Sequence, residues 1–576
     1  MAFHQEETGS HHVASPGLYL PSSCSNCPSA INVASFIVAG HYRRRHTVHF
    51  AVPADTMLVY FVNVAVFSAV AFYFIRSLKK KFQKEVDHFL TFFRDSKLPP
   101  GPWGVPGLGY LPFMAGKNPY TVFSTLADQY GGMAFVELGQ KNILVISDPG
   151  ILRETYKLAA FSARPNSKLK DDTMIGNKGI IQAVGDVWSE HRRLILTAFR
   201  TIGLKTAAPT SVTPQTSHIN EIIHRDVHEY LKFINQLVVG RRDDGGVMLE
   251  RLTGRLAGSC ISSCVFGLTK KFDDADFAEN VKIIEEGFQV GELIAPFEFL
   301  PLLRRIPVWW KKVENKMRKN HCFTCQYFSG MIAEKSEEKI SHADSLITIY
   351  KEEMARKDSI AASHILSEPQ LRQTMTDLFC AGTETVKYSL LWSFLYMAKY
   401  PEIQRAVQKE IDAVYSDKEQ LADYDDIINM PFTEATILET MRLRPVLPMG
   451  HARATHEAYT SYRGHHIPPN TVVLSLIWDI HTNPKFWDNP DEFRPSRFIN
   501  SEGKTFRPEN FIPFGLGRRS CMGDQMAMKE LFITFTSLLN RYTIVPTDGE
   551  EIDLGWRIML SLLVPSKLPI ALVPRV

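Results

Sequence analysis

The segment Phe514-Gly-Leu-Gly-Arg-Arg-Ser-Cys521-Met-Gly523 places one cysteine in a glycine-rich, basic loop, and residues 525–539 follow it with helical periodicity. A reactive thiolate needs a low pKa, which nearby guanidinium groups, a helix N-terminus and main-chain N–H groups can supply. Cys521 has all of these neighbours in the sequence. A buried structural cysteine is the commoner alternative, but it would not need two glycines and two arginines before it. We therefore predict a functional thiolate at Cys521.

A long helix is predicted upstream, beginning near Ser367 and Pro369, because serine can cap a helix and proline fits its first turn. Gly382 inside this helix costs about 1 kcal/mol relative to alanine. Either simple packing or a function of the segment Ala381-Gly-Thr-Glu-Thr385 must compensate for that cost. One face of the helix is indicated by residues that recur every three or four positions, namely Leu371, Met375, Leu378, Phe379, Gly382 and Thr385.

Two further motifs are ambiguous when each is taken alone. Glu439 and Arg442 are three residues apart, so a helix would place carboxylate and guanidinium on one face, but most such pairs are exposed and weak. Trp188 and Arg192 are four residues apart and are both hydrogen-bond donors suited to a carboxylate. A single arginine is nevertheless most often a solvated surface charge.

Taken together, the four segments resemble the cytochrome P-450 superfamily of haem-thiolate monooxygenases. The haem-binding loop of that family follows the pattern Phe, two free positions, Gly, one free position, Arg, one free position, Cys. Phe514, Gly517, Arg519 and Cys521 fill this pattern completely. The other motifs occur in the family's order and at its usual spacing.

The resemblance implies a haem cofactor, with Cys521 as the axial ligand of the iron; an axial thiolate favours O–O cleavage. It also implies that Glu439 and Arg442 form a buried ion network behind the haem with Arg497, from Phe493-Arg-Pro-Ser-Arg497. That network would serve folding and haem retention. The residues implied to bind the haem are Trp188, Arg192, Arg453, Phe514, Gly515, Arg519 and Gly523.

For the long helix, the resemblance implies that Gly382 allows a local opening over the haem. Thr385 would hydrogen-bond oxygen there, and Glu384 would help to bring in protons. The implied substrate pocket is apolar and includes Phe379, Ala381, Gly382, Val446 and Leu447.

Composition and periodicity set the fold class. The chain has 576 residues, of which 45% are apolar and 22% charged, and its formal net charge is +3. These values exclude a disordered chain and a nucleic-acid binder that relies on a basic tail. Helical periodicity dominates from residue 120, and only residues 142–147 and 471–476 read well as strands. We expect a mainly α fold with small β-sheets, the cytochrome P-450 fold, as one domain over residues 98–576, with loops at 207–217 and 240–246.

The N-terminal region predicts a membrane anchor. Residues 57–75 carry no charge and are long enough to cross a bilayer core of about 30 Å. The basic linker at 76–97 favours a cytosolic position for the rest of the chain. A cleaved secretory signal is the alternative, but no small-residue cleavage site follows. Residues 1–56 show no sustained period, so we expect disorder there. With the proline-rich hinge at 98–107, these features resemble the animal microsomal branch of the superfamily.

The resemblance implies insertion of one oxygen atom from O2 into a lipophilic small molecule: a steroid, a fatty-acid-like molecule or a xenobiotic. Electrons would come from NADPH through a flavoprotein reductase in the endoplasmic reticulum membrane, where the anchor meets lipid. Two alternatives stay open, a haem-thiolate isomerase or dehydratase that needs no reductase and a non-enzymatic haem-binding protein. The intact Glu384-Thr385 pair disfavours both, since neither needs protons delivered to dioxygen.

Overall fold

A computed structural model of the chain describes residues 97–166, 178–204, 214–239, 245–337, 345–356, 365–456 and 460–575. The predicted extension at 1–56 and the predicted anchor at 57–75 lie outside these ranges, as does the linker at 76–97 except for its last residue. Among the described helices, none is both long and apolar enough to cross a bilayer.

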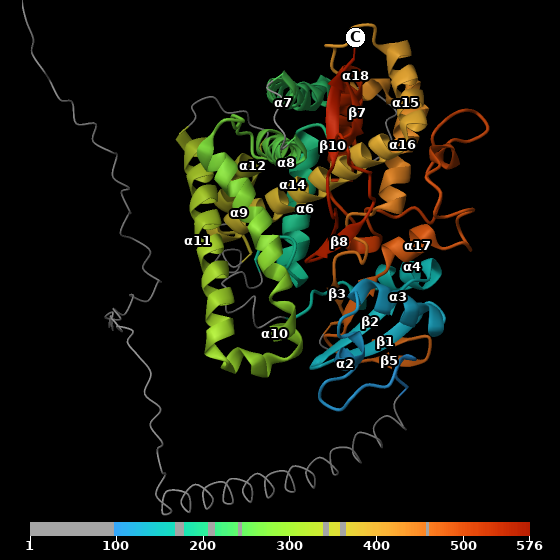
Figure 1. The fold of residues 1–576 in the computed structure, drawn as a ribbon. Coiled ribbons are helices and arrows are strands. Elements are labelled where there is room, and N and C mark those ends of the chain that lie inside the picture. Colours follow the sequence, from blue (N-terminus) through green and yellow to red (C-terminus); the bar gives the residue numbers. More distant parts are fainter. Residues whose placement is uncertain are drawn as a thin grey trace, which may run out of the picture. The chain divides into compact units, whose positions relative to one another are not determined.

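The helix predicted from residue 367 onward is present as α14 (Glu368–Lys399), and it lies at the centre of the helical part of the molecule (Figure 1). Pro369 occupies its first turn, whereas Ser367 stands at the N-cap position without a side-chain hydrogen bond. Most of its side chains are buried because helices contact it from several sides. These neighbours are α8 (Gly245–Cys264), α11 (Pro307–Glu337), α16 (Pro431–Leu443) and α18 (Asp524–Arg541).

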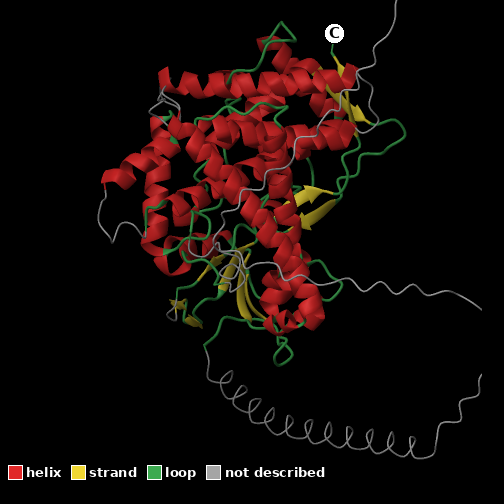
Figure 2. Ribbon diagram, turned by 90° about the vertical axis from the view of Figure 1, so that its left-hand side faces the viewer, coloured by secondary structure: helices red, strands yellow, loops and turns green. Residues whose placement is uncertain are grey.

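The remaining helices confirm the mainly α fold class (Figure 2). They are α2 (Leu111–Met114), α3 (Pro119–Gln129), α4 (Pro149–Lys157), α6 (Gly185–Thr201), α7 (Pro214–Val239), α9 (Ala275–Glu292), α10 (Ala295–Phe299), α12 (Leu346–Arg356), α15 (Pro401–Val414) and α17 (Ile477–Thr482). Short 3-10 turns occur at η1 (Ala159–Phe161), η2 (Pro301–Arg305), η3 (Tyr424–Asn429), η4 (Pro495–Phe498) and η5 (Gly517–Arg519).

One four-stranded sheet has the order β1-β2-β6-β3. Its strands are β1 (Met133–Leu138), β2 (Lys141–Ile146), β3 (Arg453–Ala454) and β6 (Val472–Ser475). β1 and β2 form an antiparallel hairpin, while β2 and β6 are parallel, with Ile143 opposite Val472. The strands predicted at 142–147 and 471–476 are thus confirmed as β2 and β6.

The sequence analysis did not predict β1 and β3 of this sheet. It also missed the strands that form separate, small antiparallel pairs. They are β4 (Thr460–Tyr462) with β5 (His465–Ile467), β7 (Tyr542–Pro546) with β10 (Ile570–Pro574), and β8 (Trp556–Met559) with β9 (Leu562–Pro565). Strands of three to five residues are too short to show a two-residue period clearly.

The loop predicted at 207–217 is partly wrong. Helix α7 already begins at Pro214, because proline is well suited to the first turn of a helix. The rest of that segment, residues 205–213, and residues 240–244 of the second predicted loop lie outside the described ranges.

Candidate active site

Two glycines shape the Cys521 loop ahead of α18. The Cys521 N–H donates to the carbonyl oxygen of Phe514 at 2.9 Å, which closes the loop. Gly515 and Gly517 have φ of 70° and 68°, in the left-handed region that favours glycine. Gly517 meets a second restriction, since a Cβ there would lie 2.3 Å from the carbonyl oxygen of Tyr156. Both glycines therefore fix the backbone path that presents Cys521.

Cys521 is exposed as a residue, but protein surrounds its thiol closely enough to affect the titration of that group. Burial raises the pKa of Cys521 to about 11, although the Gly523 N–H and the Arg192 guanidinium act in the opposite direction. The expectation of a low pKa for the Cys521 thiol is therefore wrong for the polypeptide without a bound cofactor. Arg519 donates to the carbonyl oxygens of Ser162 and Ala183. A metal cation would be needed to hold the thiolate.

Four arginines from separate segments converge beside this loop. Within the described part of the chain, their hydrogen bonds all end on main-chain oxygens. The groups are Arg164 (Nη1 to Ala452 O, 2.6 Å), Arg192 (Nη1 to Ser520 O, 3.1 Å), Arg453 (Nη2 to Leu516 O) and Arg519 (Nη2 to Ala183 O, 2.7 Å).

The concentration of positive charge changes the acidity of these guanidinium groups. Burial, together with repulsion from Arg164, Arg453 and Arg192, lowers the pKa of Arg519 to about 8. Burial and Arg453 lower the pKa of Arg164 to about 9. Nη1 of Arg453 is buried and has no hydrogen-bond partner among the described residues. A dianionic group suits such a donor set, and the two propionates of haem are such a group.

Helix α6 brings Trp188 and Arg192 to the same place. Trp188 is buried, and the Arg519 guanidinium lies 4.1 Å from the centre of its ring. Arg518 lies on the same ring at 5.9 Å. The indole therefore supports the arginine cluster through cation–π contact, a contact that the sequence did not predict.

The centre of α14 differs from the local opening predicted at Gly382. The helix runs unbroken from Glu368 to Lys399, and the Thr385 hydroxyl donates to the Ala381 carbonyl at 2.6 Å. A Cβ at Gly382 would lie 2.4 Å from Cδ1 of Ile261 on α8. Close packing between two helices thus accounts for this glycine. Ala381 itself is exposed although most of α14 is buried.

Glu384 does not share the exposure of Ala381. Its side chain is fully buried, and Oε2 lies 2.8 Å from the ammonium of Lys387. Apart from this ion pair, neither Oε1 nor Oε2 has a hydrogen-bond partner among the described residues.

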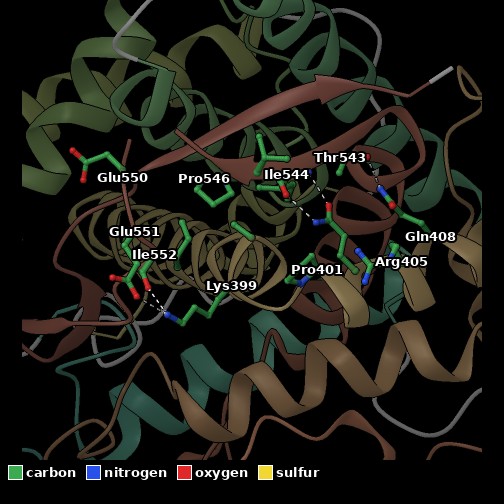
Figure 3. Close-up of a pocket in the computed structure, with 13 residues that line it drawn as sticks. Lys399, Pro401, Arg405, Gln408, Thr543, Ile544, Pro546, Glu550, Glu551 and Ile552 are labelled. Atoms are coloured by element: carbon green, nitrogen blue, oxygen red, sulfur yellow. Dashed lines mark hydrogen bonds and ion pairs between the residues drawn. The ribbon is translucent and has the colours of Figure 1, made fainter. Parts of the chain in front are cut away.

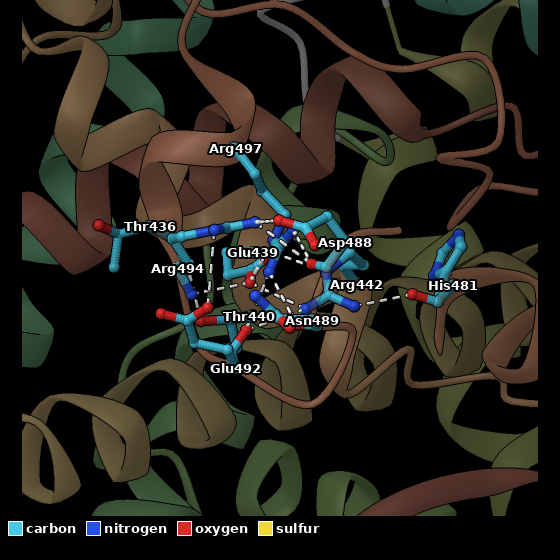
Figure 4. Close-up of polar contacts among 10 residues, drawn as sticks. All are labelled: Thr436, Glu439, Thr440, Arg442, His481, Asp488, Asn489, Glu492, Arg494 and Arg497. Carbon is cyan, nitrogen blue, oxygen red and sulfur yellow. Dashed lines mark hydrogen bonds and ion pairs between the residues drawn. The ribbon is translucent and has the colours of Figure 1, made fainter. Parts of the chain in front are cut away.

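A buried ion network joins Glu439, Arg442 and Arg497 (Figure 4). Arg442 binds Glu439 through two bonds, Nε to Oε2 at 2.7 Å and Nη2 to Oε1 at 2.9 Å. Nε of Arg497 donates to the same Oε1 at 2.9 Å. Arg442 also donates to the carbonyl oxygens of His481 and Glu492, so the network ties α16 to α17 and to the segment before η4.

The residues predicted for the substrate pocket have different environments. Phe379 is fully buried, with its ring against Phe277 and Phe328. Val446 and Leu447 are half-buried beyond the end of α16. A separate hollow of about 710 Å³ between α15 and β7 contains none of the predicted site residues; it is lined by groups that include Lys399, Arg405, Gln408, Ile544 and Glu551 (Figure 3).

Some residues of the site were missed by sequence reasoning. Arg164 and Tyr156 reach the cluster only through the tertiary fold, and Tyr156 stacks beneath Arg453 at 3.5 Å. Their local sequence carries no signal for this role. Lys387 had a signal, since it follows Glu384 at the same three-residue spacing that singled out Glu439 and Arg442.

Comparison with known proteins gives a consistent result. The family model for Cytochrome P-450 matches residues 99–571. The chain is 32% identical to Cytochrome P-450 18a1 of Drosophila melanogaster over 464 residues, 79% of this chain and 83% of that protein. It is 30% identical to Cytochrome P-450 2J5 of Mus musculus over 493 residues, 83% of this chain and 91% of that protein. It is 31% identical to Cytochrome P-450 2B4 of Oryctolagus cuniculus over 471 residues, 80% and 90% of the two chains.

Proposed function

The chain belongs to the cytochrome P-450 family and is therefore a haem-thiolate monooxygenase, and we propose that it oxidises a lipophilic small molecule with electrons passed from NADPH by a flavoprotein reductase. One oxygen atom of O2 would enter a steroid, a fatty-acid-like molecule or a xenobiotic.

Haem is the cofactor that the family implies, and when bound through a thiolate it supplies the electron density that favours O–O cleavage. We propose Cys521 as the iron ligand. Arg192, Arg453, Arg519 and Trp188 would hold the propionates, with Phe514, Gly515 and Gly523 shaping the loop. The observation that carries this proposal is the convergence of four arginines, all bonded to main-chain oxygens, beside an exposed cysteine.

The proton chemistry is proposed for the middle of α14. Thr385 would release its hydroxyl from the Ala381 carbonyl and donate a hydrogen bond to dioxygen in the site. Glu384 would pass protons inward as a general acid, a role in which carboxyl groups typically contribute 10²- to 10⁴-fold. The support for this assignment is the match to the family's motif and the exposure of Ala381 in an otherwise mostly buried helix.

The substrate would lie against apolar side chains. We propose Phe379, Ala381, Gly382, Val446 and Leu447 as its boundary, because the segment after α16 and the centre of α14 supply apolar groups that are at least partly accessible, Phe379 excepted. Phe379, which is fully buried, would then pack behind the residues that line the pocket and support them from the core.

The proposed location is the endoplasmic reticulum membrane, with the domain at 98–576 on the cytosolic side. Residues 57–75 would form the anchor, residues 76–97 the basic linker and residues 1–56 a disordered extension. Expression of a 57–576 form tests this. We expect it to fractionate with membranes and to fold, whereas a soluble or unfolded product would contradict the proposal.

The haem ligand is tested by the difference spectrum of the dithionite-reduced protein with and without carbon monoxide. The wild type and Cys325→Ala, which removes a half-buried cysteine of α11, should both give the red-shifted Soret band of a thiolate ligand. Cys521→Ala should lose it. If the folded, haem-loaded wild type lacked that band, Cys521 would not be the iron ligand.

Reductase dependence separates monooxygenation from the alternatives. NADPH consumption on addition of purified reductase supports the proposal. Conversion of a lipid hydroperoxide without reductase would favour an isomerase or dehydratase.

A further inference from the structure

Lys387 and Glu384 form a buried ion pair in the middle of α14. Their side chains are 1% and 0% exposed, and the distance from Nζ of Lys387 to Oε2 of Glu384 is 2.8 Å. The stem of the lysine packs closely against Gly254 on α8, because a Cβ at that glycine would lie only 3.3 Å from Cδ of Lys387. The pair is therefore held by packing from a second helix as well as by charge.

A second carboxylate lies within reach of the same ammonium. Glu285 on α9 approaches Nζ of Lys387 to 3.5 Å, and its side chain is 30% exposed. The Tyr388 ring lies 4.4 Å from Nζ, and the Tyr388 hydroxyl donates to Glu250 on α8 at 3.2 Å. Lys387 thus stands between one carboxylate that is shut off from solvent and one that solvent can reach.

The charges around the pair have opposing effects on its titration. Burial raises the pKa of Glu384 above its ordinary value; Lys387 opposes this rise, and Glu285 and Glu250 add to it. For Lys387, burial lowers the pKa, but Glu384, Glu285 and Glu250 together raise it above its ordinary value. Lys387 therefore keeps its proton, and its positive charge opposes the protonation of Glu384 in the interior.

We propose that Lys387 is a positioning residue with two partners: it holds the Glu384 carboxylate in the resting enzyme, and it moves to Glu285 when Glu384 takes up a proton. This inference rests on the proposed role of Glu384 as the proton-delivering acid. Both partners lie within 3.5 Å of Nζ, so the exchange needs only a small displacement of the ammonium.

The proton count of the exchange is balanced. A proton from water converts the Glu384 carboxylate into a neutral carboxyl, and Lys387, still protonated, loses the charge that attracted it. The ammonium then pairs with Glu285. The released carboxyl can rotate and give its proton to dioxygen that has been reduced by the electrons from NADPH and the reductase, after which the restored carboxylate draws Lys387 back. Lys387 never gives up its own proton.

The first test measures the protonation state of Glu384 by infrared spectroscopy of the full-length, haem-loaded protein at pH 7.4. Lys387→Met leaves Glu384 without a counter-ion, so we expect an acid C=O band that is absent from Lys387→Met/Glu384→Gln. The wild type and Lys387→Arg should show no such band. If the single variant Lys387→Met and the double variant have the same spectrum in this region, the proposal is overturned.

The second test removes the alternative partner. In Glu285→Gln, Lys387 should stay on Glu384, so the infrared spectrum should match the wild type. NADPH consumption with reductase should nevertheless fall about tenfold, since proton delivery is slowed, and the ratio of rates in H2O and D2O should rise. Glu286→Gln is the matched control, because Glu286 is the next residue of α9 and pairs with Lys316 at 3.5 Å.

Equal rates and equal isotope ratios in Glu285→Gln and the wild type would overturn the inference. Failure of the proposed function has a different signature, since the wild type itself would then consume no NADPH on addition of reductase. The infrared comparison does not depend on turnover, so it reports on Lys387 and Glu384 in either case.

Discussion

The imidazole of His481 accepts a hydrogen bond from the main-chain N–H of Ile512, with 2.9 Å between Nε2 and N. His481 is fully buried, and its carbonyl oxygen accepts a bond from Arg442. The neutral ring therefore links the Glu439 network to the segment that leads into the Cys521 loop. Burial and the Arg442 charge lower the pKa of His481 to about 3.

This linkage predicts a loss of stability in acid. Between pH 6.5, the ordinary pKa of histidine, and about 3, the unfolded chain binds a proton at His481 that the folded protein does not. The free energy of unfolding should therefore fall as the pH falls, by about 1.4 kcal/mol per pH unit from this group. Urea titrations of the wild type and His481→Gln at several pH values measure the difference. Parallel pH curves for the two proteins would contradict the assignment.

The two loop glycines should differ in their tolerance of alanine. In Gly515→Ala the only penalty is the left-handed backbone conformation, which costs about 1–2 kcal/mol for a residue with a side chain. No atom lies within 4 Å of the new Cβ position. Gly517→Ala meets the same restriction and also the carbonyl oxygen of Tyr156 at 2.3 Å. We expect a larger loss of unfolding free energy and a weaker carbon monoxide band in Gly517→Ala. Equal effects would show that the contact with Tyr156 is relieved without cost.

Breaking the buried network should be expensive. Glu439→Gln leaves two buried guanidinium groups without their carboxylate, so we expect a loss of about 3–5 kcal/mol in unfolding free energy. Glu502→Gln breaks an exposed pair with Lys504 and should cost less than about 1 kcal/mol. Urea titration followed by tryptophan fluorescence compares them. Similar losses of unfolding free energy in both variants would show that burial does not determine how much the Glu439 network stabilises the protein.

Arg453 should control haem retention. Its Nη1 is a buried donor without a partner among the described residues, and Arg453→Leu would remove a charge-assisted bond to a propionate. We expect haem loss to excess apomyoglobin to be about 10- to 100-fold faster. Arg463→Leu, which removes an exposed partner of Glu154, is the control. Unchanged haem loss in Arg453→Leu would exclude this arginine from the haem site.

Gly382 and Ile261 should be energetically coupled. Gly382→Ala forces its Cβ against Ile261, and overpacking of this kind costs about 1–3 kcal/mol. In the double variant Gly382→Ala/Ile261→Ala the clash is gone, so the combined loss should be smaller than the sum of the two single losses, by about 0.5–3 kcal/mol. An additive double variant would mean that Gly382 serves a purpose other than packing against α8.

The sequence predicted the elements whose signal is local. The Cys521 loop, the helix over 368–399 and the spacing of Glu439 and Arg442 depend on neighbours along the chain, and these features are present. Strands as short as β3 carry no readable period, because two residues cannot show an alternation. Gly382 was assigned to a local opening because nothing in its own helix reveals the packing of Ile261. Arg164 escaped notice for the same reason, since only the tertiary fold brings it to Arg453.

The parallel pairing of β2 with β6 has a consequence for the order of events on the ribosome. Ile143 pairs with Val472, which is synthesised much later. The hairpin of β1 and β2 therefore leaves the ribosome long before the strand that pairs with β2 has been made. During that interval one edge of β2 offers free main-chain donors and acceptors, which are a known template for wrong pairing between chains. Nascent protein that stalls before residue 472 leaves that edge open to pairing with another chain. Yield in cells will therefore depend on how quickly residues 147–475, which separate β2 from the end of β6, are synthesised.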